Sequence, residues 1–274
     1  MIIAIGIMAL VGILTAIDAL KAKLKEDFAM MGSNTFSISH RNVRIQRSDE
    51  RKVNRNITYQ EAQALKERFG NNIGVVSISQ VATGAATLKY KSEKTNPNVR
   101  IIGGDENYLG TTGYNVGEGR NITKTDVNLA SNVVIIGKDI VDALFKGAES
   151  PLGSEIRVGA GIYRVIGVLE SKGSSIGFSG DNQCIIPLSN LRVNYGLDSR
   201  SYNLNVMVRS TEFLEAAVAE ATGLFRIIRK DPPGKESTFS ISKSDQIASF
   251  VIDQLGFISI IATAIGLITL LGAA

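Results

Sequence analysis

Residue types that carry much of enzyme chemistry are scarce in this 274-residue sequence, which contains no tryptophan, one cysteine and one histidine. The single cysteine, Cys184, excludes an intrachain disulfide framework, and its place in the apolar segment QCIIPL predicts a buried thiol. The single histidine, His40, excludes zinc sites of the HExxH type, and we expect it to be an exposed polar residue. The sequence also lacks a GxxxxGK[ST] phosphate-binding loop and a CxxC pair, so it predicts no catalytic, cofactor or metal site within this chain.

Charge is nearly balanced, with 30 Lys and Arg against 26 Asp and Glu and a net charge of +4. The basic residues are scattered and have no tryptophan among them, so a nucleic-acid partner is not expected. The small positive excess is compatible with an anionic lipid surface nearby. The acids Asp105, Glu106, Glu118 and Asp126 are spread over expected loops and are predicted to be surface acids rather than a carboxylate pair for hydrolysis.

What the sequence does contain is a long uncharged run at each end, covering residues 1–17 and 255–274. About twenty apolar residues are needed for a helix to span a bilayer, so the two runs predict two membrane helices with a large water-exposed domain between them. We expect that more protein lies beyond each end. A signal peptide and a buried hairpin in a soluble protein are the alternatives; the first lacks a basic leading region, and the second fits poorly with runs at opposite termini.

The first predicted membrane helix is expected to continue beyond the bilayer as a stalk. Apolar residues recur at three- and four-residue steps through residues 18–31, with Leu24 and Phe28 among them, and Gly32 suits the end of a helix. An amphipathic helix lying flat on the membrane is the alternative for this segment. Residues 242–254 resume a helical pattern and lead into the second span.

The region between the two stalks alternates predicted strands and helices. A capping box at Thr58 and Glu61 opens a predicted helix that ends at Gly70, and a glycine turn at residues 159–161 predicts a hairpin. Turn-rich or loop segments are expected at 117–127 and 172–182. Predicted strands cover residues 35–39, 73–81, 86–90, 99–103, 133–137, 154–158, 162–170, 184–188, 202–208 and 238–242, and further predicted helices cover 138–145 and 212–229.

One pentapeptide, TFSIS, occurs twice, at residues 35–39 and 238–242. The first copy follows the first predicted stalk and the second precedes the second. We therefore predict that these two strands pair in one sheet, with the intervening residues inserted between them.

Five segments along the chain form an ordered set: GSNTFSI (32–38), NITYQEAQAL (56–65), VRIIGGDENYLGTTGYNVGEGRNITKTDV (99–127), VVIIGKDIVDALF (133–145) with SPLGSEIRVGAGIYRVIGVLESKG (150–173), and GFISIIATAIGLITLLGAA (256–274). Taken in this order, these segments resemble the MacB/FtsX-type ABC transporter permeases. Ile122 stands where these permeases often have an aromatic residue, which is a conservative difference.

The resemblance implies an α+β fold in which two transmembrane helices flank a periplasmic domain. That domain would consist of a porter-like α/β lobe with an inserted, mostly-β lobe. The implied division is 1–31 for the first transmembrane helix and stalk, 32–103 for the first part of the porter-like lobe, 104–199 for the inserted lobe, 200–243 for the second part of the porter-like lobe, and 244–274 for the second stalk and the start of the second transmembrane helix.

The resemblance also implies partners and a location. An ABC ATPase, fused or separate, would hold ATP and Mg outside this chain, and the permease would act as a homodimer or as a heterodimer with a paralogue. A periplasmic adaptor and membrane lipid are further expected partners. The implied location is the bacterial inner membrane, in a multi-pass protein whose large domain lies in the periplasm.

The function expected on this basis is that of a non-enzymatic permease subunit, which transmits ATP-driven motion from the cytoplasm to the periplasmic domain to drive export. A membrane-anchored extracytoplasmic sensor or binding module is the alternative, and a membrane-tethered enzyme is a third possibility. The residues expected to couple the helices to the domain are Asp18, Leu24, Phe28, Gly32, Ser244 and Asp253.

Overall fold

The structure is a computed structural model of the whole chain and divides it into two compact units, Met1–Ser33 with Ser242–Ala274, and Asn34–Ile241. Among the residues described, no helix is both long and apolar enough to cross a membrane. The predicted spans and stalks lie largely outside the described residues, apart from single positions and a helical turn at 15–19. The residues described are 8, 12, 15–19, 34–41, 55–70, 73–146, 150–171, 174–175, 178–197 and 199–244.

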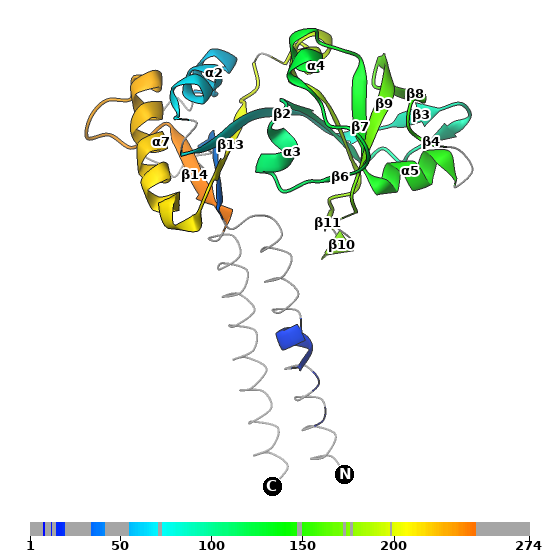
Figure 1. Cartoon of the computed structure of the whole chain (residues 1–274), viewed down its shortest axis with the longest axis horizontal. Helices are drawn as coiled ribbons and strands as arrows, with labels where there is room; N and C mark the ends of the chain where they lie inside the picture. The colour runs from blue at the N-terminus through cyan, green and yellow to red at the C-terminus, as the bar shows by residue number, and fades with distance from the viewer. Residues whose placement is uncertain are drawn as a thin grey trace, which may run out of the picture. The chain divides into compact units, whose positions relative to one another are not determined.

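A mixed sheet of twelve strands organises the larger unit, in the order β14-β1-β13-β2-β5-β12-β7-β9-β8-β3-β4, with β6 paired to β9 (Figure 1). Antiparallel pairs predominate, but β5 with β12 and β7 with β9 are parallel. The strands are β1 Thr35–His40, β2 Gly74–Ala86, β3 Leu88–Tyr90, β4 Glu93–Lys94, β5 Val99–Gly104, β6 Val116–Gly119, β7 Val133–Ile136, β8 Glu155–Val158, β9 Gly161–Leu169, β12 Gln183–Pro187, β13 Asn203–Val208 and β14 Phe239–Lys243. A separate hairpin pairs β10 Ser174–Ser175 with β11 Phe178–Ser179.

The helices are short apart from α7, which packs beside α2 near the β14 end of the sheet (Figure 1). The capping box predicted at Thr58 and Glu61 is confirmed at the start of α2, and the helix predicted at 138–145 is confirmed as α5. The helices are α2 Tyr59–Arg68, α3 Tyr108–Thr111, α4 Lys124–Asn128, α5 Lys138–Phe145, α6 Leu188–Tyr195 and α7 Leu214–Arg229, and a 3-10 turn, η1 Thr211–Phe213, precedes α7.

The first hydrophobic core lies between α2, α7 and one face of the strands β1, β13 and β2. On β13 the buried residues Leu204 and Val206 alternate with the half-buried Asn203 and Asn205, as the two-residue period of a strand requires. Helix α7 contributes Phe225 to this core, together with Leu214, Ala217 and Ala221 at helical spacing. One face of these strands is therefore apolar and covered by helices, and the other face carries mostly serine and asparagine.

The prediction that the two TFSIS strands share a sheet is confirmed, because β14 is the neighbour of β1. The hydroxyls of Ser39 and Ser240, from the two copies, lie 3.1 Å apart. The first and last strands of the larger unit, β1 and β14, are therefore neighbours in the sheet.

Two further cores cover the two faces of the central strands β5, β12 and β7. Cys184 and Ile186 of β12 enter one core, while Ile185 between them enters the other. Burial on both faces explains why these strands read as continuous apolar runs. The buried thiol predicted for Cys184 is confirmed.

The predicted hairpin at residues 159–161 is also confirmed, with Val158 paired to Gly161 across β8 and β9. Gly159 has φ +60°, in the left-handed region that a tight hairpin turn needs and that glycine adopts most readily. The segment 82–101, which includes β3 and β4, contributes its apolar side chains to the same core as this hairpin. The lobe boundaries at residues 103 and 199 stay predictions.

Three expectations about the polar segments are wrong. His40 is half-buried rather than exposed, and its Nδ1 has no hydrogen-bond partner within the described part of the chain. The segment 172–182, predicted as a loop, contains the β10–β11 hairpin. Two of the four acids predicted to lie at the surface, Asp105 and Asp126, are buried. Each carboxylate has an ion-pair partner and accepts a hydrogen bond from a backbone N–H, and these contacts replace the hydrogen bonds to water that burial removes.

Asp126 supports a prediction about acid stability. Its carboxylate lies 2.7 Å from Arg120 and completes the capping box of Thr123, and these bonds, that of Arg120 foremost, lower its pKa from 3.8 to about 2. A lowered carboxyl pKa stabilises the fold above the unfolded value, and this contribution is lost as the pH falls through the lower one. We therefore expect Asp126→Asn to lower the thermal midpoint at pH 6, by a margin that shrinks between pH 4 and 2. Circular dichroism of the detergent-solubilised chain would measure both midpoints, and a margin independent of pH would contradict the assignment.

Candidate functional site

The predicted coupling residues fall mostly outside the described part of the chain, which leaves out Leu24, Phe28, Gly32 and Asp253. Asp18 is an exposed residue of the helical turn at 15–19, and Ser244 is the helical residue that follows β14. The coupling role of all six therefore stays a prediction.

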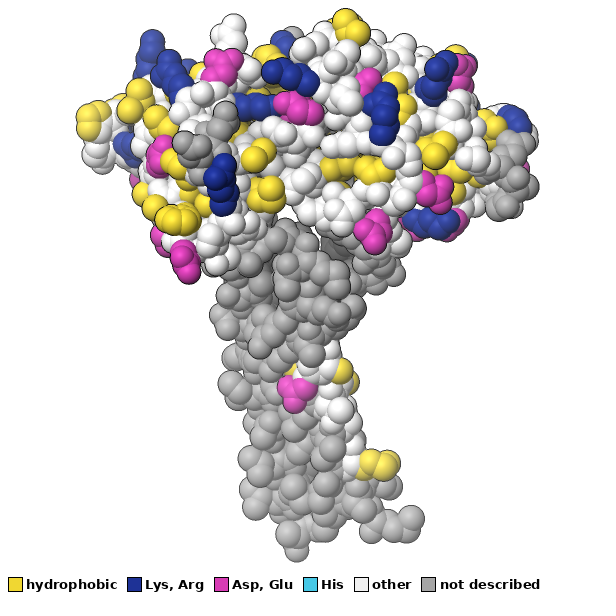
Figure 2. Space-filling model, viewed as in Figure 1, with side chains coloured by type: hydrophobic (Ala, Val, Ile, Leu, Met, Phe, Trp, Pro, Cys, Tyr) yellow, Lys and Arg dark blue, Asp and Glu magenta, His cyan; other side chains and the backbone are white. Residues whose placement is uncertain are grey.

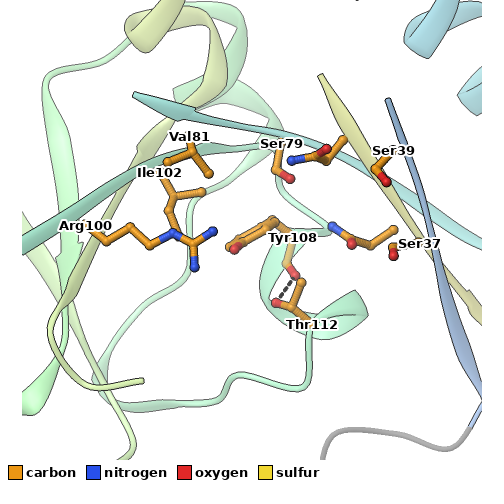
Figure 3. A pocket seen from close by; sticks show the side chains of 10 residues that line it. Ser37, Ser39, Ser79, Val81, Arg100, Ile102, Tyr108 and Thr112 are labelled. Carbon is orange, nitrogen blue, oxygen red and sulfur yellow. Dashed lines mark hydrogen bonds between the residues drawn. The ribbon is translucent and has the colours of Figure 1, made fainter. Parts of the chain in front are cut away.

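A different site emerges on the polar face of the sheet, where a pocket of about 260 Å³ lies beside α3 (Figure 3). Successive residues of a strand point to opposite faces, so the residues opposite to the first core on β1, β13 and β2 line the pocket, and most of them are serine or asparagine. The lining residues are Ser37, Ser39, Ser79, Val81, Arg100, Ile102, Tyr108, Thr112, Asn203 and Asn205.

Arg100 is the only one of the ten lining residues whose side chain is charged at neutral pH, so the pocket carries one positive charge. Arg100 on β5 and Tyr108 on α3 point toward one another in Figure 3. Arg100 is exposed, whereas Tyr108 is 7% exposed. Burial raises the pKa of Tyr108 well above its usual range, an effect that Tyr114 increases and Arg100 opposes, so the phenol is a neutral hydrogen-bond donor at physiological pH.

Helix α3 is held against the sheet by a dense set of hydrogen bonds. The Asp105 carboxylate accepts from the backbone N–H of Ile78 at 2.9 Å and of Asn107 at 3.1 Å. The Ser77 and Thr111 hydroxyls lie 2.6 Å apart, which ties the far end of α3 to β2. These bonds fix the backbone from which the tyrosine ring enters the pocket.

Gly104, the last residue of β5, makes room for that ring. A Cβ at this position would lie 2.8 Å from Cγ of Tyr108, closer than side chains tolerate. Gly104 thus has a packing role in placing Tyr108, whereas a Cβ at Gly103 would meet Leu191 of α6 instead.

An ion pair behind α3 connects it to α2. Lys66 Nζ lies 2.7 Å from Asp105 and 2.9 Å from Glu106. Burial lowers the pKa of Lys66, but Asp105 and Glu106 outweigh it and the net pKa is raised. Burial raises the pKa of Asp105, and the ammonium of Lys66 acts against that rise. The pair therefore joins α2 to the segment that positions Tyr108.

The side chains that line the pocket are suited to binding a ligand through hydrogen bonds. Within the described part of the chain, no group of three or more His, Cys, Asp or Glu residues is placed to hold a metal ion. On the face shown in Figure 2, basic and acidic side chains are interspersed over the domain, as the small net charge predicts. The pocket offers hydroxyls, carboxamides, one guanidinium and a small apolar floor formed by Val81 and Ile102.

Sequence reasoning missed this pocket because its residues come from four strands and α3, which are far apart in sequence. The only local signal is the run of serine and asparagine at alternate positions of the segments TFSIS and YNLNVMV. That pattern predicts a polar sheet face but does not reveal that α3 lies against it.

Comparison with known proteins gives a consistent family signal. A family model described as "MacB-like periplasmic core domain" matches residues 1–224. The chain is 27% identical over 278 residues to the macrolide export ATP-binding/permease protein MacB of Hahella chejuensis, covering 98% of this chain and 41% of that protein. The MacB of Neisseria gonorrhoeae is also 27% identical, over 98% of this chain and 39% of its own length. The chain therefore spans about two-fifths of the length of these curated relatives.

Solved structures show the same fold. The periplasmic region of MacB from Actinobacillus actinomycetemcomitans aligns with a TM-score of 0.64 at 22% identity, covering 84% of this chain and 97% of that one. The extracellular domain of the noncanonic ABC-type transporter YknZ from Gram-positive bacteria aligns with a TM-score of 0.58 at 24% identity, covering 76% of this chain and all of that one.

Proposed function

The chain belongs to the MacB-like periplasmic core domain family, and we propose that it is part of an ABC transporter permease that transmits ATP-driven motion to drive export. The observation that carries this proposal is the family match over residues 1–224, which extends through most of the folded domain. Relatives that align over nearly the whole chain are named ATP-binding/permease proteins, which supports the permease assignment.

The proposal includes partners that lie outside this chain. An ABC ATPase, either fused or separate, would bind ATP and Mg, since the sequence has no phosphate-binding loop of its own. A homodimer or a heterodimer with a paralogous permease, a periplasmic adaptor and membrane lipid complete the proposed assembly. The protein would reside in the bacterial inner membrane with its large domain on the outer side. Macrolides, which the relatives' names give as exported compounds, are the first cargo to test.

The proposed mechanism is rigid-body transmission through the two stalks. The larger unit is well suited to move as one body because a single sheet runs from β14 to β4 and three packed cores cover it. Its two ends are adjacent strands, so displacements of residues 18–32 and 244–254 would act on neighbouring points of the sheet.

This mechanism makes a prediction about the first stalk. Replacing Lys23-Leu24 by Gly-Pro should destabilise the predicted stalk helix by about 3 kcal/mol or more, and should interrupt the rigid connection between membrane and domain. We expect ATP turnover by the assembled transporter to persist while export of a macrolide falls to background. The matched control is Lys23-Leu24 replaced by Ala-Ala, which preserves helix propensity. Unchanged export by the Gly-Pro variant, at equal membrane levels, would refute rigid-body transmission through this stalk.

A membrane-anchored binding module is the second candidate function, and the polar pocket is the observation that favours it. The two candidates differ in their partners. Co-purification of the full-length protein from its native membrane should recover an ABC ATPase if it is a permease. Recovery of the protein with no ATPase attached, fused or separate, would favour the binding module.

A further inference from the structure

We propose that the polar pocket between β1, β13, β2, β5 and α3 binds the C-terminal end of a short peptide, with Arg100 and Tyr108 taking its carboxylate. Binding at this pocket does not depend on the transport proposal, because the pocket lies wholly within the folded unit Asn34–Ile241. Three features of the lining residues support it: the sign of the charge, the type of hydrogen-bonding groups, and their spacing.

The positive charge of the pocket lining favours an anionic ligand. Arg100 is the only charged residue of the lining, and no Asp or Glu stands among the ten lining residues. A planar guanidinium binds a carboxylate through parallel N–H donors, and such charge-assisted bonds are among the strongest in proteins. The Tyr108 hydroxyl, which Figure 3 shows directed at Arg100, supplies a further donor at the same place.

The remaining polar groups fit a peptide better than a simple acid. Asn203 and Asn205 are two residues apart on β13, and both face the pocket side of the strand. Residues two apart on a strand are separated by about 6.6–6.8 Å, which is also the repeat of an extended peptide. A carboxamide offers a donor and an acceptor together, so two of them at this spacing match the N–H and C=O groups of an extended backbone.

The apolar part of the pocket would contact the side chain of the last peptide residue. Val81 and Ile102 lie near Arg100 in Figure 3, beside the position proposed for the carboxylate. A small aliphatic side chain on the last residue of the peptide could cover them. Ser79, which is 5% exposed, adds a hydroxyl between this apolar floor and the asparagines.

The test uses the full chain in detergent and the probe Ala-Ala-Ala, with its C-terminal amide as the comparison ligand. Binding would be measured by isothermal titration calorimetry and saturation-transfer NMR. We expect the free acid to bind with a dissociation constant of about 1 mM or tighter. Arg100→Gln should weaken it at least about tenfold, because a charge-assisted hydrogen bond is lost. The amide should bind wild type and Arg100→Gln equally weakly.

Two further variants separate pocket binding from general effects. Arg157→Gln removes an exposed arginine from β8, outside the pocket, and should leave affinity for the free acid unchanged. Asn205→Asp keeps the side-chain size but adds a negative charge, so it should weaken the free acid more than the amide. Far-UV circular dichroism would establish that each variant is folded.

Four results would overturn the proposal. They are no detectable binding of Ala-Ala-Ala to the wild-type chain, equal binding of the acid and the amide, equal losses in Arg100→Gln and Arg157→Gln, and binding of acetate as tight as that of the peptide. The last result would assign the pocket to carboxylates in general and leave the asparagines without a role.

Discussion

Arg229→Met is expected to lower the free energy of unfolding of the folded domain by about 3–5 kcal/mol, the loss typical when one partner of a buried ionic network is removed. The side chain of Arg229 is completely buried at the end of α7. It donates to Thr238 at 2.7 Å, to Glu61 at 3.1 Å, and to the backbone carbonyls of Arg55 at 2.7 Å and Asn56 at 3.4 Å. Methionine fills similar space but leaves these acceptors without their donor.

The geometry also predicts that lysine will not rescue the loss. The acceptors surround the guanidinium on several sides, and three of its nitrogens are used, which a single ammonium group does not reproduce. Arg209→Met is the matched control, because Arg209 is exposed and should change stability by no more than about 0.5 kcal/mol. Thermal and denaturant unfolding of the detergent-solubilised chain, followed by circular dichroism, would compare the variants. Equal midpoints for Arg229→Met and Arg209→Met would show that the network contributes nothing.

The features that sequence reasoning predicted correctly are those decided by neighbouring residues. The capping box of α2 needs only Thr58 and Glu61, three residues apart. The turn between β8 and β9 needs a residue that accepts positive φ, and Gly159 supplies it. The pairing of β14 with β1 is non-local, but the repeated pentapeptide made it visible in the sequence.

The features that were missed depend on residues brought together by the fold. Asp105 reads as a loop acid, yet it is buried because Lys66, 39 residues earlier, reaches it from α2. Helix α3 is one turn long and has no periodic pattern to detect, although it carries Tyr108 into the pocket. Arg100 reads as one exposed position of an alternating strand, and only the folded sheet brings it to the same pocket as Asn203 and Asn205. Local pattern therefore predicts the elements, whereas the candidate site follows from their packing.

Lys66→Met is expected to destabilise the domain by about 2–4 kcal/mol, because it leaves the Asp105 carboxylate buried without its cation. The Asp105 side chain is 4% exposed and that of Lys66 is 20% exposed, so water screens the pair little. Lys138→Met is the matched control: Lys138 pairs with Asp142 at 3.1 Å, but both side chains are more than half exposed, and pairs of this kind contribute at most about 0.5 kcal/mol.

A double-mutant cycle separates the cost of the unpaired charge from the loss of packing by the lysine stem. Asn at position 105 carries no charge and keeps one oxygen, which can accept from Ile78 or from Asn107 but not from both, so Lys66→Met combined with Asp105→Asn should be more stable than Lys66→Met alone. Because the same pair positions the segment that carries Tyr108, Lys66→Met should also weaken binding of Ala-Ala-Ala at temperatures where the variant is still folded. If the double variant is no more stable than Lys66→Met, the buried charge is not the source of the loss, and the lysine acts through packing alone.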